Sequence, residues 1–99
     1  MLETTTTQEN GVLTVAPAGR LDTTNASDFE KEIVGQLDGV TKVVFDLKQL
    51  EYISSAGLRI LLSVQKKLAD NGKMTLTNVS GEVMEILDIT GFVDIFEIA

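Results

Sequence analysis

The chain has 99 residues, the length of one small domain with a single core. It contains no cysteine and no histidine, which excludes disulfides, thiol nucleophiles and the commonest catalytic base. The net charge of −7 disfavours nucleic acids and anionic membranes as direct partners, because both repel an acidic surface. The N-terminus lacks the basic and apolar regions of a signal peptide. We therefore expect one cytoplasmic domain over residues 1–99 that binds other proteins.

The first third of the chain is predicted to form a β-hairpin followed by a helix. Asn10-Gly11 is a strong signal for a tight hairpin turn between two strands rich in threonine and valine. Pro17 lies in the second of these strands and predicts an edge strand or a strand end, because proline cannot donate a ladder hydrogen bond. Apolar residues then recur at helical spacing and predict an amphipathic helix that ends at Asp38-Gly39. The buried stripe of this helix consists of Ala26, Phe29, Ile33 and Leu37.

The rest of the chain is predicted to alternate between strands and helices. Strands are expected over residues 41–47, 73–79 and 92–98, and helices over residues 55–72 and 80–91. The expected helix stops are Asn71-Gly72 and Gly91, and Ser80 is the expected N-cap of the last helix. The order β-β-α-β-α-β-α-β predicts an α/β fold with a mixed sheet of about five strands. Helices are expected mainly on one face, since three helices are too few to cover both faces.

Two adjacent serines, Ser54 and Ser55, stand at the start of a predicted helix in the segment SSAGL. Free backbone N–H groups at a helix start favour a serine cap, and capping alone is the simplest role for either hydroxyl. One hydroxyl is enough for capping, and the neighbouring residues are small, so the other hydroxyl can be reached by a second protein. A phosphate there would add about −1.5 to −2 charges and repel a docked partner without unfolding the domain. Capping and phosphorylation are thus both open.

Catalysis by the chain itself is not expected. A serine nucleophile needs a base within hydrogen-bond reach, and without histidine a Ser-Lys pair is the remaining arrangement. The nearby lysines are predicted to be solvated surface charges: Lys48, Lys66 and Lys67. The sequence has no phosphate-binding glycine loop and no EF-hand spacing, so we expect no cofactor and no metal. A small Ser-Lys hydrolase is kept as an alternative, which loss of activity in a Ser55→Ala variant would support.

Three segments resemble, in order, those of the bacterial anti-sigma factor antagonists, which are single STAS domains. GRLDTTNASDFE, at residues 19–30, is similar to the Gly-x-Leu-Asp segment that leads into the first helix of that family. VVFDLKQLEYISSAGLRILL, at residues 43–62, resembles the strand, loop and helix start that hold the family's phosphorylated serine. LDITGFVDIF, at residues 87–96, resembles its late helix, turn and final strand.

The resemblance implies a protein that switches between partners. Its unphosphorylated form would bind an anti-sigma factor with serine-kinase activity and so free a sigma factor. Phosphorylation by that kinase would release the antagonist, and a PP2C-type phosphatase would restore it. The family's acceptor stands two residues before a Gly-Leu pair that Gly57-Leu58 matches, so the resemblance implies Ser55 as the acceptor and Ser54 as its rival. Ser54 stands where the family usually has aspartate, and Ala56 stands where it has serine or threonine.

The resemblance also implies a partner-binding surface around Ser55. Asp22 matches the aspartate of the Gly-x-Leu-Asp segment, and we expect it to shape this surface, to bond to the Ser55 hydroxyl, or to act as a plain helix-start acid. The other expected partner-binding residues are Thr23, Thr24, Ser54, Ala56, Gly57, Leu58 and Arg59. A second interpretation keeps the STAS fold but makes the protein a constitutive subunit of a signalling or lipid-transport assembly, with Ser55 unmodified.

Overall fold

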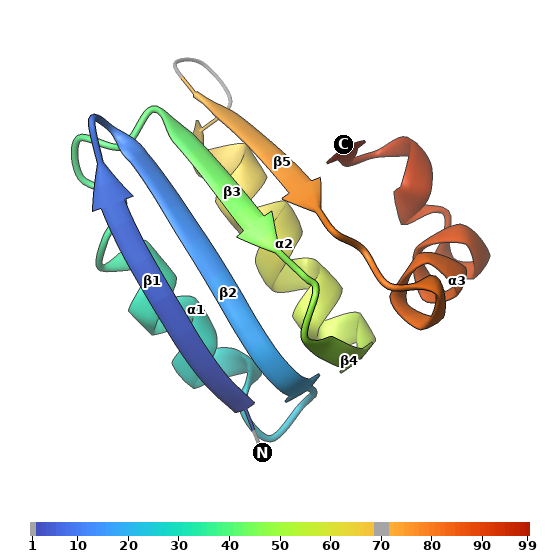
Figure 1. Ribbon diagram of the computed structural model, residues 1–99. Helices are drawn as coiled ribbons and strands as arrows, with labels where there is room; N and C mark the ends of the chain where they lie inside the picture. The colour runs from blue at the N-terminus through green and yellow to red at the C-terminus, as the bar shows by residue number, and fades with distance from the viewer. Residues whose placement is uncertain (1, 69–71) are drawn as a thin grey trace.

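The structure, a computed structural model, describes residues 2–68 and 72–99 (Figure 1). Within these residues, six strands form one mixed sheet in the order β1-β2-β3-β5-β6, and β4 pairs with β2. The strands are β1 Leu2–Glu9, β2 Val12–Leu21, β3 Lys42–Asp46, β4 Leu50–Ile53, β5 Lys73–Thr77 and β6 Glu97–Ile98. The helices are α1 Ala26–Val34, α2 Ser55–Leu68 and α3 Gly81–Thr90, and a 3-10 turn, η1 Phe92–Asp94, follows α3. The predicted α/β fold with a mixed sheet is confirmed. Neither described range contains a helix long and apolar enough to cross a bilayer.

The predicted hairpin forms between β1 and β2. The two strands are antiparallel along the whole of β1, from the pair Leu2 and Gly19 to the pair Glu9 and Val12. Asn10 and Gly11 both have positive φ angles, of 53° and 79°, as a tight turn of the type favoured by Asn-Gly requires. All other strand pairs in the sheet are parallel.

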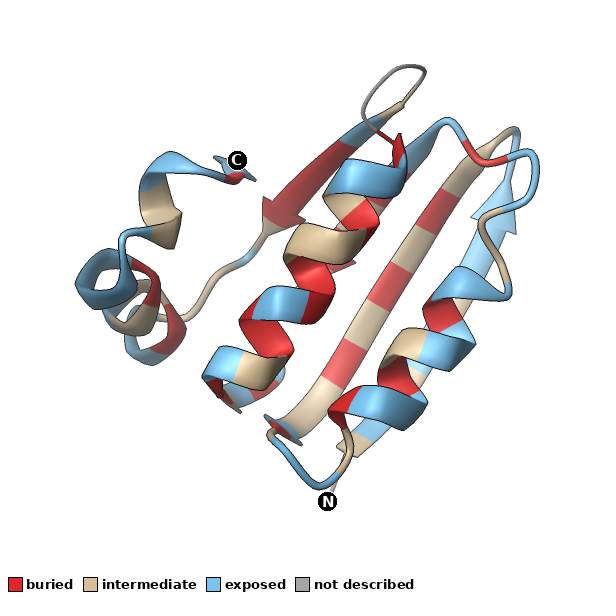
Figure 2. Cartoon of the chain, turned by 180° about the vertical axis from the view of Figure 1, so that it is seen from behind, coloured by how far each residue is buried: buried red, intermediate tan, exposed pale blue. Residues whose placement is uncertain are grey.

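α1 and α2 lie side by side on one face of the sheet, as expected, and their buried residues face it (Figure 2). Phe29 and Ile33 of α1 and Leu61 of α2 are buried against Val15 of β2 and Phe45 of β3 in one apolar cluster. The rings of Phe29 and Phe45 have centroids 6.4 Å apart. Burial of each such side chain stabilises the fold by roughly 1.5–3 kcal/mol. α3 lies at the edge of the sheet, against β4 and η1 (Figure 1).

The expectation that Pro17 marks an edge strand or a strand end is wrong. β2 has β1 on one side, and on the other side it pairs with β3 over residues 12–15 and with β4 over residues 19–21. Pro17 falls between these two parallel ladders. Its missing N–H therefore costs no hydrogen bond on that side of β2, which is why an interior strand tolerates the proline.

The end of the chain differs from the predicted strand over residues 92–98. Gly91 takes a left-handed conformation with φ of 82° and stops α3, as predicted, but η1 follows it and only β6 joins the sheet. Phe92 and Phe96 stack with ring centroids 5.4 Å apart, a contact between residues four apart that favours a helical turn over a strand. Gln65 Nε2 of α2 donates to the Ile95 carbonyl at 3.3 Å and holds this segment against the helix layer.

The remaining predictions concern the helix ends, and one short strand was not predicted. α1 ends at Val34, before the predicted stop at Asp38-Gly39, and Leu37 packs on the core from the loop that follows. Part of the stop predicted at Asn71-Gly72 lies outside the described residues. The predicted cap Ser80 is confirmed, since its hydroxyl accepts from the Val83 N–H at 3.3 Å. The strand β4 was not predicted, although it connects the sheet directly to α2.

Candidate phosphorylation and partner-binding site

The end of β2 meets the start of α2 at one corner of the sheet. Ser54 joins β4 to α2, and its backbone N–H donates to the Leu21 carbonyl at the end of β2 at 2.9 Å. The loop that contains Asp22, Thr23 and Thr24 follows directly after Leu21. Two segments that are far apart in the sequence and were both expected to contact a partner are therefore neighbours in the fold.

Ser54 has the role of a helix cap. Its carbonyl accepts the first helical hydrogen bond, from the Leu58 N–H at 2.9 Å, and its hydroxyl accepts from the Gly57 N–H at 3.2 Å. The residue is only 9% exposed. This is the arrangement of a serine N-cap, which satisfies an otherwise free backbone donor. A kinase would have to break the cap to reach this hydroxyl.

Ser55 lies in a different environment, although it is the next residue. It is the first residue of α2 and is exposed. In the described part of the chain, its hydroxyl has no hydrogen-bond partner. The two open roles of the serine pair are thus divided in the structure: Ser54 caps the helix, and Ser55 presents a free hydroxyl to solvent.

Gly57 lets α2 approach the strands closely. A Cβ atom at this position would lie 2.8 Å from Cγ1 of Ile53 and 2.9 Å from Cγ of Leu21, distances that real Cβ atoms do not adopt. The following residue, Leu58, is completely buried. The first turn of α2 is therefore fixed directly on the ends of β2 and β4, which holds Ser55 at a defined place.

Burial divides the expected partner-binding residues into two groups. Ser54, Gly57 and Leu58 lie below the surface, where they support the first turn of α2, and their part in partner binding stays a prediction. The expected residues that do reach the surface are Asp22, Thr23, Thr24, Ser55, Ala56 and Arg59, of which Asp22 and Ala56 are half-buried.

Asp22 shapes the loop between β2 and α1. Its Oδ1 accepts from the Thr24 hydroxyl at 2.6 Å and from the Thr24 N–H at 3.0 Å, and these two bonds lower the pKa of its carboxyl group. The Asp22 N–H donates to Asn25 Oδ1 at 3.0 Å, and Asn25 Nδ2 donates to the Arg20 carbonyl at 2.9 Å. Of the roles expected for Asp22, the structure therefore shows loop shaping and no hydrogen bond to Ser55.

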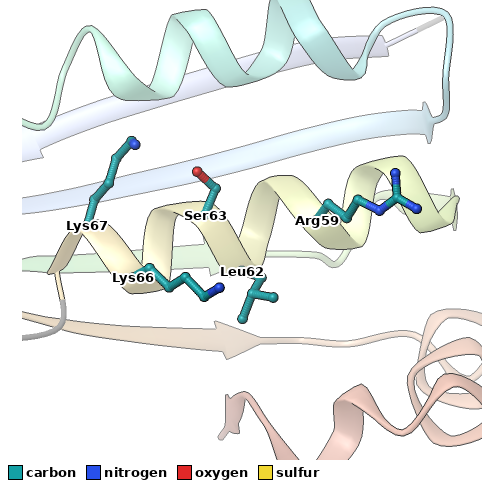
Figure 3. Close-up of a pocket in the computed structure, with 5 residues that line it drawn as sticks. All are labelled: Arg59, Leu62, Ser63, Lys66 and Lys67. Carbon is teal, nitrogen blue, oxygen red and sulfur yellow. The ribbon is translucent and has the colours of Figure 1, made fainter.

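Arg59 lies one helical turn after Ser55 and marks one end of a shallow hollow on the outer side of α2 (Figure 3). The hollow has a volume of about 460 Å³ and is lined by Arg59, Leu62, Ser63, Lys66 and Lys67. From the sequence, Lys66 and Lys67 were expected only to be solvated surface charges. The spacing of the five residues, three or four positions apart along the helix, was the signal that they share one side of α2, on which Leu62 and Ser63 are half-buried.

A second feature that was not predicted from the sequence is the contact between Arg20 and Tyr52. The Arg20 guanidinium carbon lies 4.4 Å from the centre of the Tyr52 ring, which is a cation–π contact. The two residues are paired in the parallel ladder between β2 and β4. The contact could not be predicted from the sequence, because it depends on the pairing of β2 with β4, and β4 was not predicted.

The mixed α/β sheet and the helices that cover it form a domain type that is shared with known proteins. The STAS domain family model matches residues 3–99, and the chain belongs to the STAS domain family. BtrV of Bordetella bronchiseptica, whose name gives it a provisional role as an anti-sigma factor antagonist, is 40% identical over 92 residues, which are 91% of this chain and 79% of BtrV. The anti-sigma-F factor antagonist RsfB of Mycobacterium tuberculosis is 32% identical over 71 residues, 70% of this chain and 57% of RsfB.

Solved structures show the same fold. An anti-sigma factor antagonist from Mycobacterium paratuberculosis superposes with a TM-score of 0.87 at 24% identity, over 99% of this chain and 85% of that one. The unphosphorylated form of the anti-sigma factor antagonist SpoIIAA superposes with a TM-score of 0.84 at 19% identity, over 98% of this chain and 88% of that one. At these sequence identities the two solved structures show a shared fold but do not show a shared function. Evidence on function comes from the site and from BtrV and RsfB, which are more similar in sequence.

Proposed function

We propose that this STAS domain is an anti-sigma factor antagonist controlled by phosphorylation of Ser55. In its unphosphorylated form it binds an anti-sigma factor that is also a serine kinase, and a sigma factor is freed. The observation that carries the proposal is the division of roles in the serine pair: Ser54 is buried and caps α2, whereas Ser55 is exposed with a free hydroxyl. The relatives named above, BtrV and RsfB, support the anti-sigma partner.

Phosphorylation adds charge at a place where the fold tolerates it. The kinase transfers the γ-phosphoryl group of ATP to Oγ of Ser55, the hydroxyl proton passes to a base of the kinase, and ADP leaves. No hydrogen bond of the Ser55 hydroxyl to the described residues has to be broken. The start of α2 favours negative charge, by about 0.3–1 kcal/mol for an exposed group. The domain therefore stays folded while a docked partner meets a charge of about −1.5 to −2.

The proposed docking surface around Ser55 consists of the exposed residues Thr23, Thr24 and Arg59 together with the half-buried residues Asp22 and Ala56. A kinase that binds this surface has its substrate hydroxyl in the middle of the interface. A PP2C-type phosphatase would hydrolyse the phosphate ester with water and return the protein to its binding form.

Mass spectrometry after incubation with the cognate kinase and ATP tests the proposal. We expect one phosphoryl group on Ser55 in the wild type and none in Ser55→Ala. Ser54→Ala is the matched control. It should lose about 1 kcal/mol of stability through the missing cap and still be phosphorylated on Ser55. Phosphate on Ser54, or no phosphoryl transfer to either serine by a kinase that binds the protein, would contradict the proposal, and the second result would favour the constitutive-subunit interpretation.

A further inference from the structure

α2 has an unusual charge for this protein. The chain carries 15 acidic residues against 8 basic ones, with a net charge of −7. α2, in contrast, contains Arg59, Lys66 and Lys67 and no acidic residue. All three cations line the hollow on the outer side of the helix. A negative charge placed on Ser55 would therefore appear at one end of a cationic stripe.

Arg59 is the member of this stripe that can reach Ser55. The two residues are four apart in the helix, a spacing that places their side chains on the same face, about 5–6 Å apart at Cβ. Side chains in a helix lean toward its N-terminus, so a residue covers the turn that precedes it. Figure 3 shows Arg59 extended along α2 toward the first turn, where Ser55 lies. Both residues are exposed.

The guanidinium of Arg59 is available for a new partner. With the residues in the ranges 2–68 and 72–99 it forms no ion pair. Its five N–H donors lie in a planar fork that matches the oxygens of a phosphate, and such bidentate pairs are among the strongest hydrogen bonds in proteins. A phosphoserine offers three acceptor oxygens on a short side chain.

We propose that Arg59 binds the phosphate of phosphorylated Ser55 across the first turn of α2. The inference rests on the proposed function, because it gives the phosphate its place in the same site. Arg59 is a positioning residue that holds the phosphate against the helix. When its guanidinium binds the phosphate, it no longer lines the hollow that it shares with Leu62, Ser63 and Lys66. Phosphorylation then changes the docking surface twice, by adding a dianion and by removing an exposed cation.

Phosphorus NMR on the full chain tests this contact directly. Phosphoserine is incorporated at residue 55 during translation, so that no kinase is needed, and the second pKa of the phosphate is measured by titration at 0.15 M salt. An attached guanidinium favours the dianion, and we expect Arg59→Gln to raise this pKa by about 0.2–0.4 pH unit. Arg59→Lys should keep part of the effect, since it retains the charge but not the fork.

Lys66→Gln is the matched control. It removes one exposed cation from the same hollow, but Lys66 is about three turns, or about 16 Å, from Ser55. This distance is about twice the screening length of about 8 Å at that salt concentration, and we expect a pKa change below about 0.1 unit. An unchanged phosphate pKa in Arg59→Gln would overturn the inference, and so would equal changes in Arg59→Gln and Lys66→Gln. Neither result would affect the kinase test of Ser55, so the two proposals fail separately.

Discussion

At residue 57 the first turn of α2 has no room for a side chain. Gly57→Ala would place a methyl group within 3 Å of Ile53 and Leu21, so the helix start or the strand ends must shift. We expect a loss of about 1–3 kcal/mol in the free energy of unfolding, measured by urea denaturation.

Gly81→Ala is the control for this substitution. Gly81 is also near a helix start, as the first residue of α3, but a Cβ there would have no atom within 4 Å. Alanine is the better helix former, and the variant should be as stable as the wild type or more stable by up to about 1 kcal/mol. Equal losses for Gly57→Ala and Gly81→Ala would contradict the role of close packing at the start of α2.

The carboxyl group of Asp22 gives a prediction on pH dependence. The hydroxyl and N–H of Thr24 lower its pKa from the ordinary value of 3.8. A group whose pKa is lowered by folding stabilises the fold above its ordinary pKa, and this contribution is lost as the pH falls through the lowered value. Thr24→Val removes the hydroxyl bond, so the pKa of Asp22 should rise toward 3.8, as measured by carbon NMR titration of the carboxyl group.

The same variant should show a matching change in stability. The stability difference between the wild type and Thr24→Val is expected at pH 7 and should shrink as the pH falls below about 4. Thr23→Val is the control, since Thr23 is also exposed and the hydroxyl that bonds to Asp22 belongs to Thr24. A pKa of Asp22 that does not respond to Thr24→Val would show that this bond does not hold the loop in solution.

At the scale of elements, local signals decided which parts of the fold were predictable. The hairpin at Asn10-Gly11, the cap at Ser80 and the stop at Gly91 are each determined by a few neighbouring residues, and all three were predicted correctly. β4 was missed because four residues without a clear alternation depend on pairing with β2, which is distant in the sequence. The last strand was overestimated because the apolar residues of FVDIFEI suit a strand, whereas the backbone bonds to the Phe92 carbonyl and the contact between Phe92 and Phe96 form a helical turn.

The segment from η1 to β6 is therefore expected to depend on one buried aromatic residue. Phe96 is 5% exposed and stacks on Phe92. Phe96→Ala should destabilise the domain by about 3–5 kcal/mol, measured by urea denaturation, because it leaves a cavity between the segment and the core. Ile95→Ala is the control, as Ile95 is 48% exposed, and it should change the stability by no more than about 0.5 kcal/mol. A loss for Phe96→Ala as small as that for Ile95→Ala would show that the segment is held by its hydrogen bonds alone.

At the scale of the whole molecule, the candidate site depends on contacts that the sequence shows only in part. The family resemblance at Gly57-Leu58 pointed to Ser55, but the residues of the SSAGL segment by themselves left the roles of the two serines open. The structure separates them through the strand end at Leu21, which receives the Ser54 N–H and packs on Gly57. The role of Asp22 was also left open by the sequence. Its bond to Thr24 is between neighbouring residues, whereas its distance from Ser55 depends on how β2 and α2 are packed together.

Ser55 is exposed on a tightly packed helix start, so a negative charge at this position should change partner binding and leave the fold unchanged. Ser55→Asp adds one negative charge at a position whose side chain makes no bond to the described residues. We expect at least about tenfold weaker binding to the kinase partner by calorimetry, or about 1.4 kcal/mol, with a melting temperature within about 2 °C of the wild type. Phosphoserine at the same position should weaken binding further, because it carries more charge and can engage Arg59, which a short carboxylate does poorly. If Ser55→Asp instead melted several degrees lower and kept its affinity, the exposed residue would be part of the structural support, and the regulatory role would have to lie elsewhere on the domain.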